Sequence, residues 1–103
     1  MTTGNKYNDV SKTWEVELSG EIDIYNAPEL KETFFELLDK KQGNILIDCK
    51  NLSYIDSTGL GALISVLKRV KEYDGVIEII NLKPYINKIF TITGLNKVFI
   101  IEA

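Results

Sequence analysis

The middle of the chain contains the segment Ile55-Asp56-Ser57-Thr58-Gly59-Leu60-Gly61-Ala62-Leu63, where a strand pattern changes to a helix pattern. Residues 44–49 before it are mostly apolar, as in a buried strand, whereas the apolar residues after it recur at helical spacing. This change of period places Asp56 or Ser57 at a helix start, where a short polar side chain can cap the first turn. A phosphate on Ser57 would meet free backbone N–H groups and the positive end of the helix dipole. The stretch therefore predicts a strand followed by a helix, with Ser57 as a phosphorylation switch on a small interaction domain.

Strand and helix patterns alternate outward from this stretch in both directions. Residues 13–19 alternate between apolar and polar side chains, as a strand with one exposed face does, and we expect residues 7–11 to form a short edge strand beside them. A first helix should follow Asn26-Ala27-Pro28, with Asn26 as its N-cap, and should end before Gly43. On the C-terminal side, the pattern predicts a connection over residues 50–56, a helix over 57–73, a strand over 76–80, a shorter helix between Pro84 and Gly94, and a last strand over 98–101.

This order of elements predicts the α/β fold class. Strands separated by single helices pair in parallel, while the first two strands, which are joined directly, can pair antiparallel, so we expect one mixed and mostly parallel sheet. With 103 residues, the chain is long enough for one hydrophobic core and too short for two, which predicts a single domain over residues 1–103. Hydrophobic residues make up 45% and charged residues 26% of the chain, the usual balance of a globular protein.

Charge and composition also limit the partners and the compartment. The formal net charge of -3 disfavours nucleic acid and anionic membranes as partners, because affinity for polyanions depends on clustered Lys and Arg. No apolar run approaches the roughly 20 residues of a membrane span, and residues 1–8 lack the apolar core of a signal peptide. The only cysteine, Cys49, cannot form an internal disulfide, and it shares a strand face with Ile45 and Ile47, which predicts a small core residue. We therefore expect a cytoplasmic protein.

Several kinds of catalytic site lack the residues they need. The chain contains no histidine, the commonest general base, and Ser57 lacks the glycine two positions before it that a nucleophile elbow requires. Gly59-Leu60-Gly61 resembles the beginning of a dinucleotide fingerprint, but Ile64 stands where the third glycine belongs, and the lysine of a Walker motif is absent. The carboxylates are scattered, without metal-binding spacing. We expect no catalytic activity, no cofactor and no metal.

One different mechanism remains open. Asp48, near the end of the predicted strand over residues 44–49, could accept a phosphoryl group as in response-regulator receiver domains, which also alternate strands and helices. Such a site needs further carboxylates that converge on a magnesium ion, usually at the end of the first strand. Glu15 and Glu17 instead lie within a strand, on the face predicted to be exposed.

Two motifs, at this separation in a chain of one domain, resemble a STAS domain of the anti-sigma factor antagonist type. They are Gly20-Glu21-Ile22-Asp23-Ile24-Tyr25-Asn26-Ala27-Pro28-Glu29-Leu30 and Leu52-Ser53-Tyr54-Ile55-Asp56-Ser57-Thr58-Gly59-Leu60-Gly61-Ala62-Leu63. The resemblance extends over residues 82–99, where an apolar helix, Thr93-Gly94-Leu95 and a final strand follow in the order that the family uses. It implies a sheet with helices packed mainly on one face.

The resemblance also implies a function. Such proteins, when unphosphorylated, bind an anti-sigma factor that is also a serine kinase, and thereby release a sigma factor. The kinase reverses this by phosphorylating one serine, which by motif position is Ser57, and a separate metal-dependent phosphatase removes the phosphate. Asp23 matches a position near the acceptor that helps to contact the kinase. The expected partner-binding residues are Asp23, Tyr25, Asn26, Asp56, Thr58, Gly59, Leu60 and Gly61.

The residues themselves leave several alternatives open. Polar residues at a helix start can be ordinary caps, and Gly59 and Gly61 can serve either the packing of the helix on a strand or the docking of a partner. Tyr25 and Tyr54 fit either exposed contact residues or half-buried spacers. Thr58 offers a second hydroxyl beside Ser57.

Two features of the family leave further alternatives. Many relatives continue past the last strand into another helix, whereas this sequence ends at Ala103. Single-domain STAS proteins also act as scaffolds in stress-signalling assemblies, where a different kinase modifies the serine or threonine. We expect a monomer or a weak dimer.

Overall fold

The chain forms one five-stranded sheet whose strands lie in sequence order, in a computed structural model that describes residues 1–102. β1 pairs antiparallel with β2, and the other neighbouring strands pair in parallel, so the predicted mixed, mostly parallel sheet is confirmed. The strands are β1 (Thr2–Asn8), β2 (Thr13–Ile22), β3 (Asn44–Ile55), β4 (Ile77–Ile80) and β5 (Ile100–Glu102). The helices are α1 (Ala27–Lys40), α2 (Ser57–Lys71), α3 (Pro84–Ile92) and the short 3-10 helix η1 (Leu95–Lys97).

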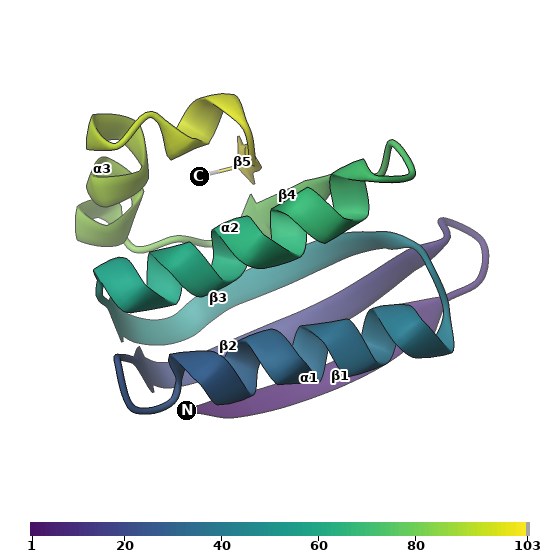
Figure 1. Cartoon of the computed structure of the whole chain (residues 1–103). Helices are drawn as coiled ribbons and strands as arrows, with labels where there is room; N and C mark the ends of the chain where they lie inside the picture. The colour runs from purple at the N-terminus through teal and green to yellow at the C-terminus, as the bar shows by residue number, and fades with distance from the viewer. Residues whose placement is uncertain (103) are drawn as a thin grey trace.

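The long helices α1 and α2 lie side by side on one face of the sheet (Figure 1). The core fills the space between them and the sheet. The apolar residues of α1 form a buried stripe on one side of the helix, and the apolar residues of α2 and the inward residues of β2 and β3 complete the core. Residues of these elements in the core are Val16, Leu18, Leu30, Phe34, Leu37, Leu38, Ile45, Ile47, Leu63, Val66 and Val70.

The edge strand β1 pairs with β2 as expected, but its predicted position was wrong. It spans Thr2–Asn8 rather than residues 7–11, because residues 9–12 form the hairpin turn. The Asn8 side chain sets this turn, since its Oδ1 accepts hydrogen bonds from the backbone N–H groups of Val10 (3.0 Å) and Ser11 (3.2 Å).

Strand β3 is twice as long as the expected segment over residues 44–49. It continues to Ile55 because β2 also continues beyond Gly20, and the two strands stay paired up to Ile22 and Ile55. The pairing shifts register near Gly20, whose φ of 84° is readily available to glycine. The expected connection over residues 50–56 is therefore mostly strand, and only Asp56 links β3 to α2.

The last third of the chain follows the predicted order with shifted boundaries. α2 ends at Lys71 rather than at residue 73, and Gly94, with φ of 77°, separates α3 from η1. β5 begins at Ile100, two residues later than expected, because Val98 and Phe99 still belong to the connection after η1. The Phe99 ring packs against the Phe90 ring, with 5.9 Å between the ring centroids.

Candidate functional site

The parallel strands β2 and β3 end side by side, whereas β4 ends earlier, level with Asp48 of β3. Residues 81–83 then run alongside β3, so that α1, α2 and α3 all begin at this edge of the sheet. Ile22 and Ile55 are paired at the ends of β2 and β3. The backbone N–H of Asp56 donates to the carbonyl of Ile22 at 3.1 Å, which ties the start of α2 to the end of β2. The loop that begins with Asp23 therefore lies beside the N-terminus of α2, as Figure 1 also shows at the left of the view.

Asp56 is the N-cap of α2. Its backbone is extended, with φ of -101° and ψ of -177°, and its carboxylate accepts a hydrogen bond from the N–H of Gly59 at 2.9 Å. Ser57, the first residue of the helix, and Thr58 are both exposed. An exposed hydroxyl at a helix start can reach the active site of another enzyme, and the helix dipole stabilises a phosphate placed there.

Asp23 and Asn26 form a reciprocal capping box before α1. The Asp23 carboxylate accepts from the N–H groups of Tyr25 (2.9 Å) and Asn26 (3.2 Å), while Asn26 Oδ1 accepts from the N–H of Asp23 at 2.9 Å. The carbonyl of Asp23 also accepts the hydrogen bond of Ala27 at 2.8 Å. Asn26 is the N-cap of α1, as predicted, but its side chain makes no capping hydrogen bond to the helix; it reaches back instead, also donating to the carbonyl of Glu21 at 2.9 Å.

Gly59 and Gly61, for which the sequence left both packing and docking open, have different surroundings. A Cβ on Gly59 would lie 2.7 Å from Ile55 Cγ1 and 2.8 Å from Ile22 Cγ2, so the missing side chain lets α2 approach the sheet. A Cβ on Gly61 would meet nothing within 4 Å. Leu60 is buried in the core. Gly59 and Leu60 thus hold α2 in place and do not lie on the surface, contrary to the expectation of direct partner contact.

A shallow hollow of about 170 Å³ lies between the N-terminal halves of α1 and α2, and its lining begins one residue after Ser57. Thr58 and Gly61 line it from α2, and Ala27, Pro28 and Lys31 line it from α1, together with Ala62 and Ser65. The absent side chain of Gly61 keeps this hollow open on the α2 side.

Exposed apolar and aromatic side chains surround this edge. Tyr25 is 90% exposed and its neighbour Ile24 is 61% exposed. Tyr54, near the end of β3, and Tyr85, in the first turn of α3, are also exposed, and the Tyr85 hydroxyl donates to the carbonyl of Ser53. The sequence did not identify Ile24 and Tyr85. The available signal for Ile24 was a large apolar residue in the predicted loop before the first helix, whereas Tyr85 lies in a helix and carries no such signal. Aromatic residues are enriched at protein interfaces, so this edge has the composition of a docking surface.

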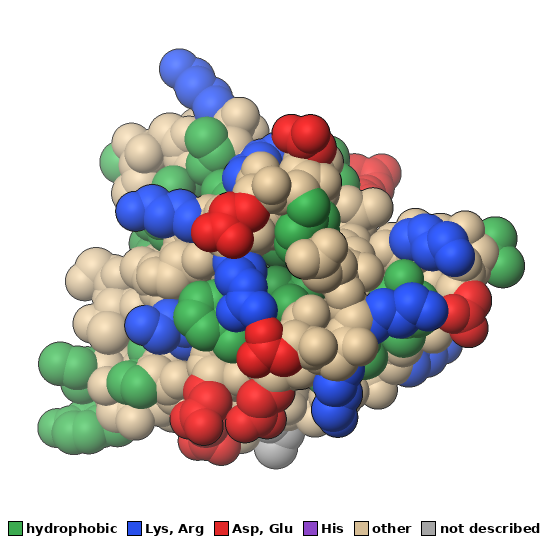
Figure 2. All heavy atoms as spheres, turned by 45° about the vertical axis from the view of Figure 1, so that its right-hand side comes forward, with side chains coloured by type: hydrophobic (Ala, Val, Ile, Leu, Met, Phe, Trp, Pro, Cys, Tyr) green, Lys and Arg blue, Asp and Glu red, His purple; other side chains and the backbone are tan. Residues whose placement is uncertain are grey.

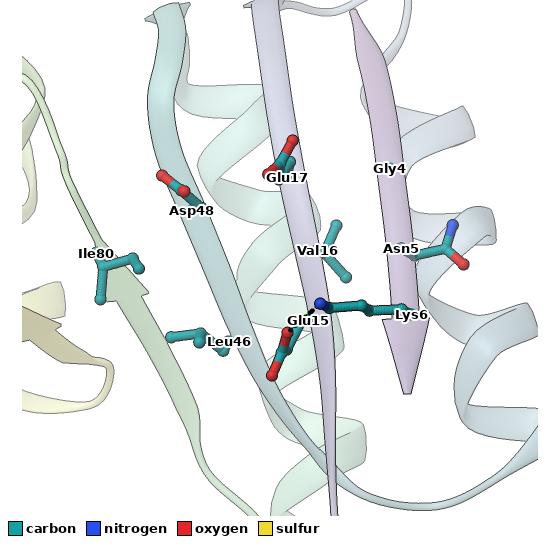
Figure 3. Close-up of a pocket in the computed structure, with 9 residues that line it drawn as sticks. All are labelled: Gly4, Asn5, Lys6, Glu15, Val16, Glu17, Leu46, Asp48 and Ile80. Carbon is teal, nitrogen blue, oxygen red and sulfur yellow. Dashed lines mark ion pairs between the residues drawn. The ribbon is translucent and has the colours of Figure 1, made fainter. Parts of the chain in front are cut away.

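Asp48 does not have the position that a receiver-type phospho-acceptor needs. Because β3 continues to Ile55, Asp48 lies in the middle of the strand and not near its end. Its side chain is on the sheet face away from α1 and α2 (Figure 3). Its Oδ1 accepts hydrogen bonds from Lys50 N and Asn81 Nδ2, both at 3.0 Å. Burial alone would raise the pKa of this carboxyl, but these two hydrogen bonds and the charge of Lys50 lower it overall. Within residues 1–102, no three ligand-type side chains are grouped so that they could hold a metal ion.

The surface in the view of Figure 2 carries basic and acidic side chains interspersed with apolar ones. This mixture differs from the clustered Lys and Arg of a nucleic-acid-binding face. None of the helices in residues 1–102 has the length and apolar character that crossing a membrane requires.

Comparison with known proteins identifies the family. The sequence model of the STAS domain matches residues 7–103. A protein of Bacillus subtilis (strain 168) named anti-sigma-B factor antagonist is 41% identical over 90 residues, which cover 86% of this chain and 81% of that protein. Two solved structures share the fold: an anti-sigma factor antagonist from Mycobacterium paratuberculosis (TM-score 0.79, 23% identity, 97% and 85% of the two chains) and the Bacillus cell fate determinant SpoIIAA in its phosphorylated form (TM-score 0.74, 18% identity, 99% and 92%). The chain therefore belongs to the STAS domain family, and within it to the anti-sigma factor antagonists.

Proposed function

We propose that this chain, in its unphosphorylated form, binds an anti-sigma factor that is also a serine kinase, and that phosphorylation of Ser57 by this kinase ends the interaction. The observation that carries the proposal is the position of Ser57, which is exposed at the start of α2 beside the loop that contains Asp23. The name of the Bacillus subtilis relative supports an anti-sigma factor as the partner, and the phosphorylated form of SpoIIAA supports phosphate as the switch.

The fold should tolerate a phosphate on Ser57. Phosphoserine carries a charge of about -1.5 to -2, and the N-terminus of a helix is a favourable place for it. The Asp56 carboxylate already caps α2 by accepting a hydrogen bond from the N–H of Gly59, so the phosphate on Ser57 would lie next to a second negative charge. We therefore expect the phosphorylated chain to remain folded while the local surface becomes strongly anionic.

Docking should be far more sensitive to the phosphate than folding. A partner that covers Ser57 removes water from the phosphate and brings it close to the carboxylates of Asp56 and Asp23. Like-charge repulsion and lost hydration of only about 3 kcal/mol already weaken binding more than a hundredfold. One covalent change at the edge of the interface is thus sufficient for a switch.

The docking surface in this proposal comprises the exposed residues around Ser57. Tyr25 offers a large aromatic contact, and Thr58 and Gly61 line the hollow between α1 and α2. Asp23 and Asn26 hold the β2–α1 loop in shape through their capping box, while part of Asp23 stays accessible. Gly59 and Leu60 contribute indirectly, because they position the first turn of α2.

Binding measurements on charge variants of Ser57 test this proposal. The protein with Ser57→Ala should bind the cognate anti-sigma factor kinase as tightly as the unphosphorylated wild type, even in the presence of ATP. Ser57→Asp should bind at least about tenfold more weakly, because a single negative charge reproduces part of the phosphate's repulsion. Isothermal titration calorimetry measures both affinities.

The matched control is Ser11→Asp, the same substitution at an exposed position in the β1–β2 turn, which should leave the affinity for the kinase at the wild-type value. Circular dichroism of all variants must show the wild-type spectrum, so that a loss of binding reflects the surface and not the fold. Equal affinity of Ser57→Ala and Ser57→Asp for the kinase would refute the assignment. A separate serine phosphatase should restore binding of the phosphorylated chain.

A further inference from the structure

The sheet face that α1 and α2 leave uncovered presents its side chains in two rows that cross the strands (Figure 3). The pairing registers define both rows from β1 to β5. The first row consists of Lys6, Glu15, Leu46, Glu78 and Ile100. The second row consists of Gly4, Glu17, Asp48, Ile80 and Glu102. We call these ten residues the open face; five of them are carboxylates and one is a lysine, and none is fully buried.

A hollow of about 470 Å³ lies in the open face. Leu46 and Ile80 supply apolar surface in it, and Glu15, Glu17 and Asp48 line it with carboxylates (Figure 3). Gly4 leaves the β1 side open, because a Cβ there would meet nothing within 4 Å. The hollow is large enough for several side chains of a bound segment.

The carboxylates of the open face are only partly neutralised within the chain. Lys6 Nζ lies 3.5 Å from Glu15, and Lys50 is the further cation that acts on Asp48. Glu17 stands directly opposite Asp48 in the pairing of β2 with β3. Like charges placed opposite each other on neighbouring strands destabilise a sheet, so this arrangement costs the fold stability.

Glu78 and Glu102 are a second pair of neighbouring carboxyl groups, which repel each other when both are ionised. A hydrogen bond with Glu102 raises the pKa of Glu78, and desolvation and the negative charge of Glu102 raise it further. A cation bound between such carboxylates relieves their repulsion, so the open face has an unmet preference for positive charge.

The spacing of the carboxylates on the open face indicates what kind of cationic partner can bind there. A single metal ion does not fit, since no three ligand-type side chains within residues 1–102 are grouped to hold one. A second copy of the chain docked face to face would bring two acidic surfaces together. Positive charges spread along a segment and interleaved with apolar side chains match both the carboxylates and the apolar pair Leu46 and Ile80.

We propose that the open face is a second docking surface, which binds a cationic amphipathic segment of a partner protein. Lys or Arg side chains of the segment pair with Glu17 and Asp48 and with Glu78 and Glu102, while its apolar side chains cover Leu46 and Ile80. The open face lies on the side of the sheet opposite α2, so the segment can bind while Ser57 is engaged by the kinase. This surface thus adds a partner to the switch and does not depend on it.

Peptide binding tests the proposal. The probes are a fluorescent peptide that alternates lysine and leucine, the same peptide with glutamate in place of lysine, and an oligolysine of equal charge. The test variant is Glu17→Gln with Glu78→Gln, which removes one partner of each like-charge pair and leaves the hydrogen bonds of Asp48 in place. The matched control is Glu32→Gln with Glu36→Gln, the same change of charge on exposed positions of α1.

We expect the lysine–leucine peptide to bind more tightly than both other peptides, with amide shifts in an NMR titration that map to β2, β3 and β4. The test variant should weaken this binding at least about tenfold, and the control variant less than about twofold. The test variant should unfold at the same or a higher urea concentration than wild type, since it relieves repulsion. Equal weakening by both variants, equal binding of oligolysine, or shifts that map to α1 and α2 would overturn the proposal. Both variants should still be phosphorylated on Ser57, so a failure here leaves the switch untouched.

Discussion

At the scale of single residues, the two glycines at the start of α2 serve different purposes. Gly59 lies where the helix touches the ends of β2 and β3, and any side chain there would clash with Ile22 and Ile55. Gly61 has open space around its Cα, yet glycine inside a helix costs stability relative to alanine. The fold explains Gly59, whereas Gly61 is explained better by the hollow that it keeps open beside Thr58.

The two alanine variants should therefore change stability in opposite directions. Gly59→Ala should lower the free energy of unfolding by about 1–3 kcal/mol through overpacking. Gly61→Ala should raise it by about 0.5–1 kcal/mol, because alanine is the better helix former. Urea denaturation measures both changes. Gly61→Ala should also bind the kinase more weakly if the hollow accepts a partner side chain, whereas destabilisation by Gly61→Ala would mean that the residue serves packing after all.

At the scale of the elements, β3 connects the core to both surfaces. Its inward residues, among them Cys49, pack beneath the helices, its outward residues contribute to the open face, and its end leads into Asp56 and Ser57. Desolvation in the core raises the pKa of the Cys49 thiol from 9.0 to about 12, the charge of Asp48 contributes to the rise, and Lys83 opposes it. A thiol in this position is protected from chemistry at neutral pH.

Iodoacetamide labelling at about pH 8 tests the burial of β3, because only an accessible thiolate reacts. We expect Cys49 to remain unmodified in the native protein and to react fully in urea. The Cys49 thiol loses its proton near pH 9 in the unfolded chain but only near pH 12 in the folded protein. The free energy of unfolding should therefore fall as the pH rises between these two values. Rapid modification of the native protein, measured by intact mass, would show that β3 is not held in the core.

At the scale of the whole molecule, much of the architecture was predictable from the sequence because local patterns and topology agree. The alternation of Trp14, Val16 and Leu18 with Glu15 and Glu17 identified β2, and the stripe that includes Phe34 identified α1. Single helices between successive strands then required parallel pairing, which the sheet has. The pattern around Asp56 placed the start of α2 correctly.

The remaining features depend on interactions that no local pattern records. β1 has little apolar alternation, and its register follows from the hairpin turn that Asn8 organises. The length of β3 follows from its pairing with β2 beyond Gly20. Ile24, Tyr54 and Tyr85 come together only because β2 and β3 end side by side and residues 81–83 run alongside β3 to α3, so the sequence alone did not group them.

Mapping of the phosphate tests whether Ser57 is the residue that the kinase phosphorylates. The wild type and the variants Ser57→Ala and Thr58→Val are each incubated with the cognate kinase and ATP, and phosphopeptides are then identified by tandem mass spectrometry. We expect one phosphate on Ser57 in the wild type and in Thr58→Val, and none in Ser57→Ala. A phosphate that resides on Thr58 in the wild type, or a wild-type chain that the kinase binds without modifying, would contradict this expectation.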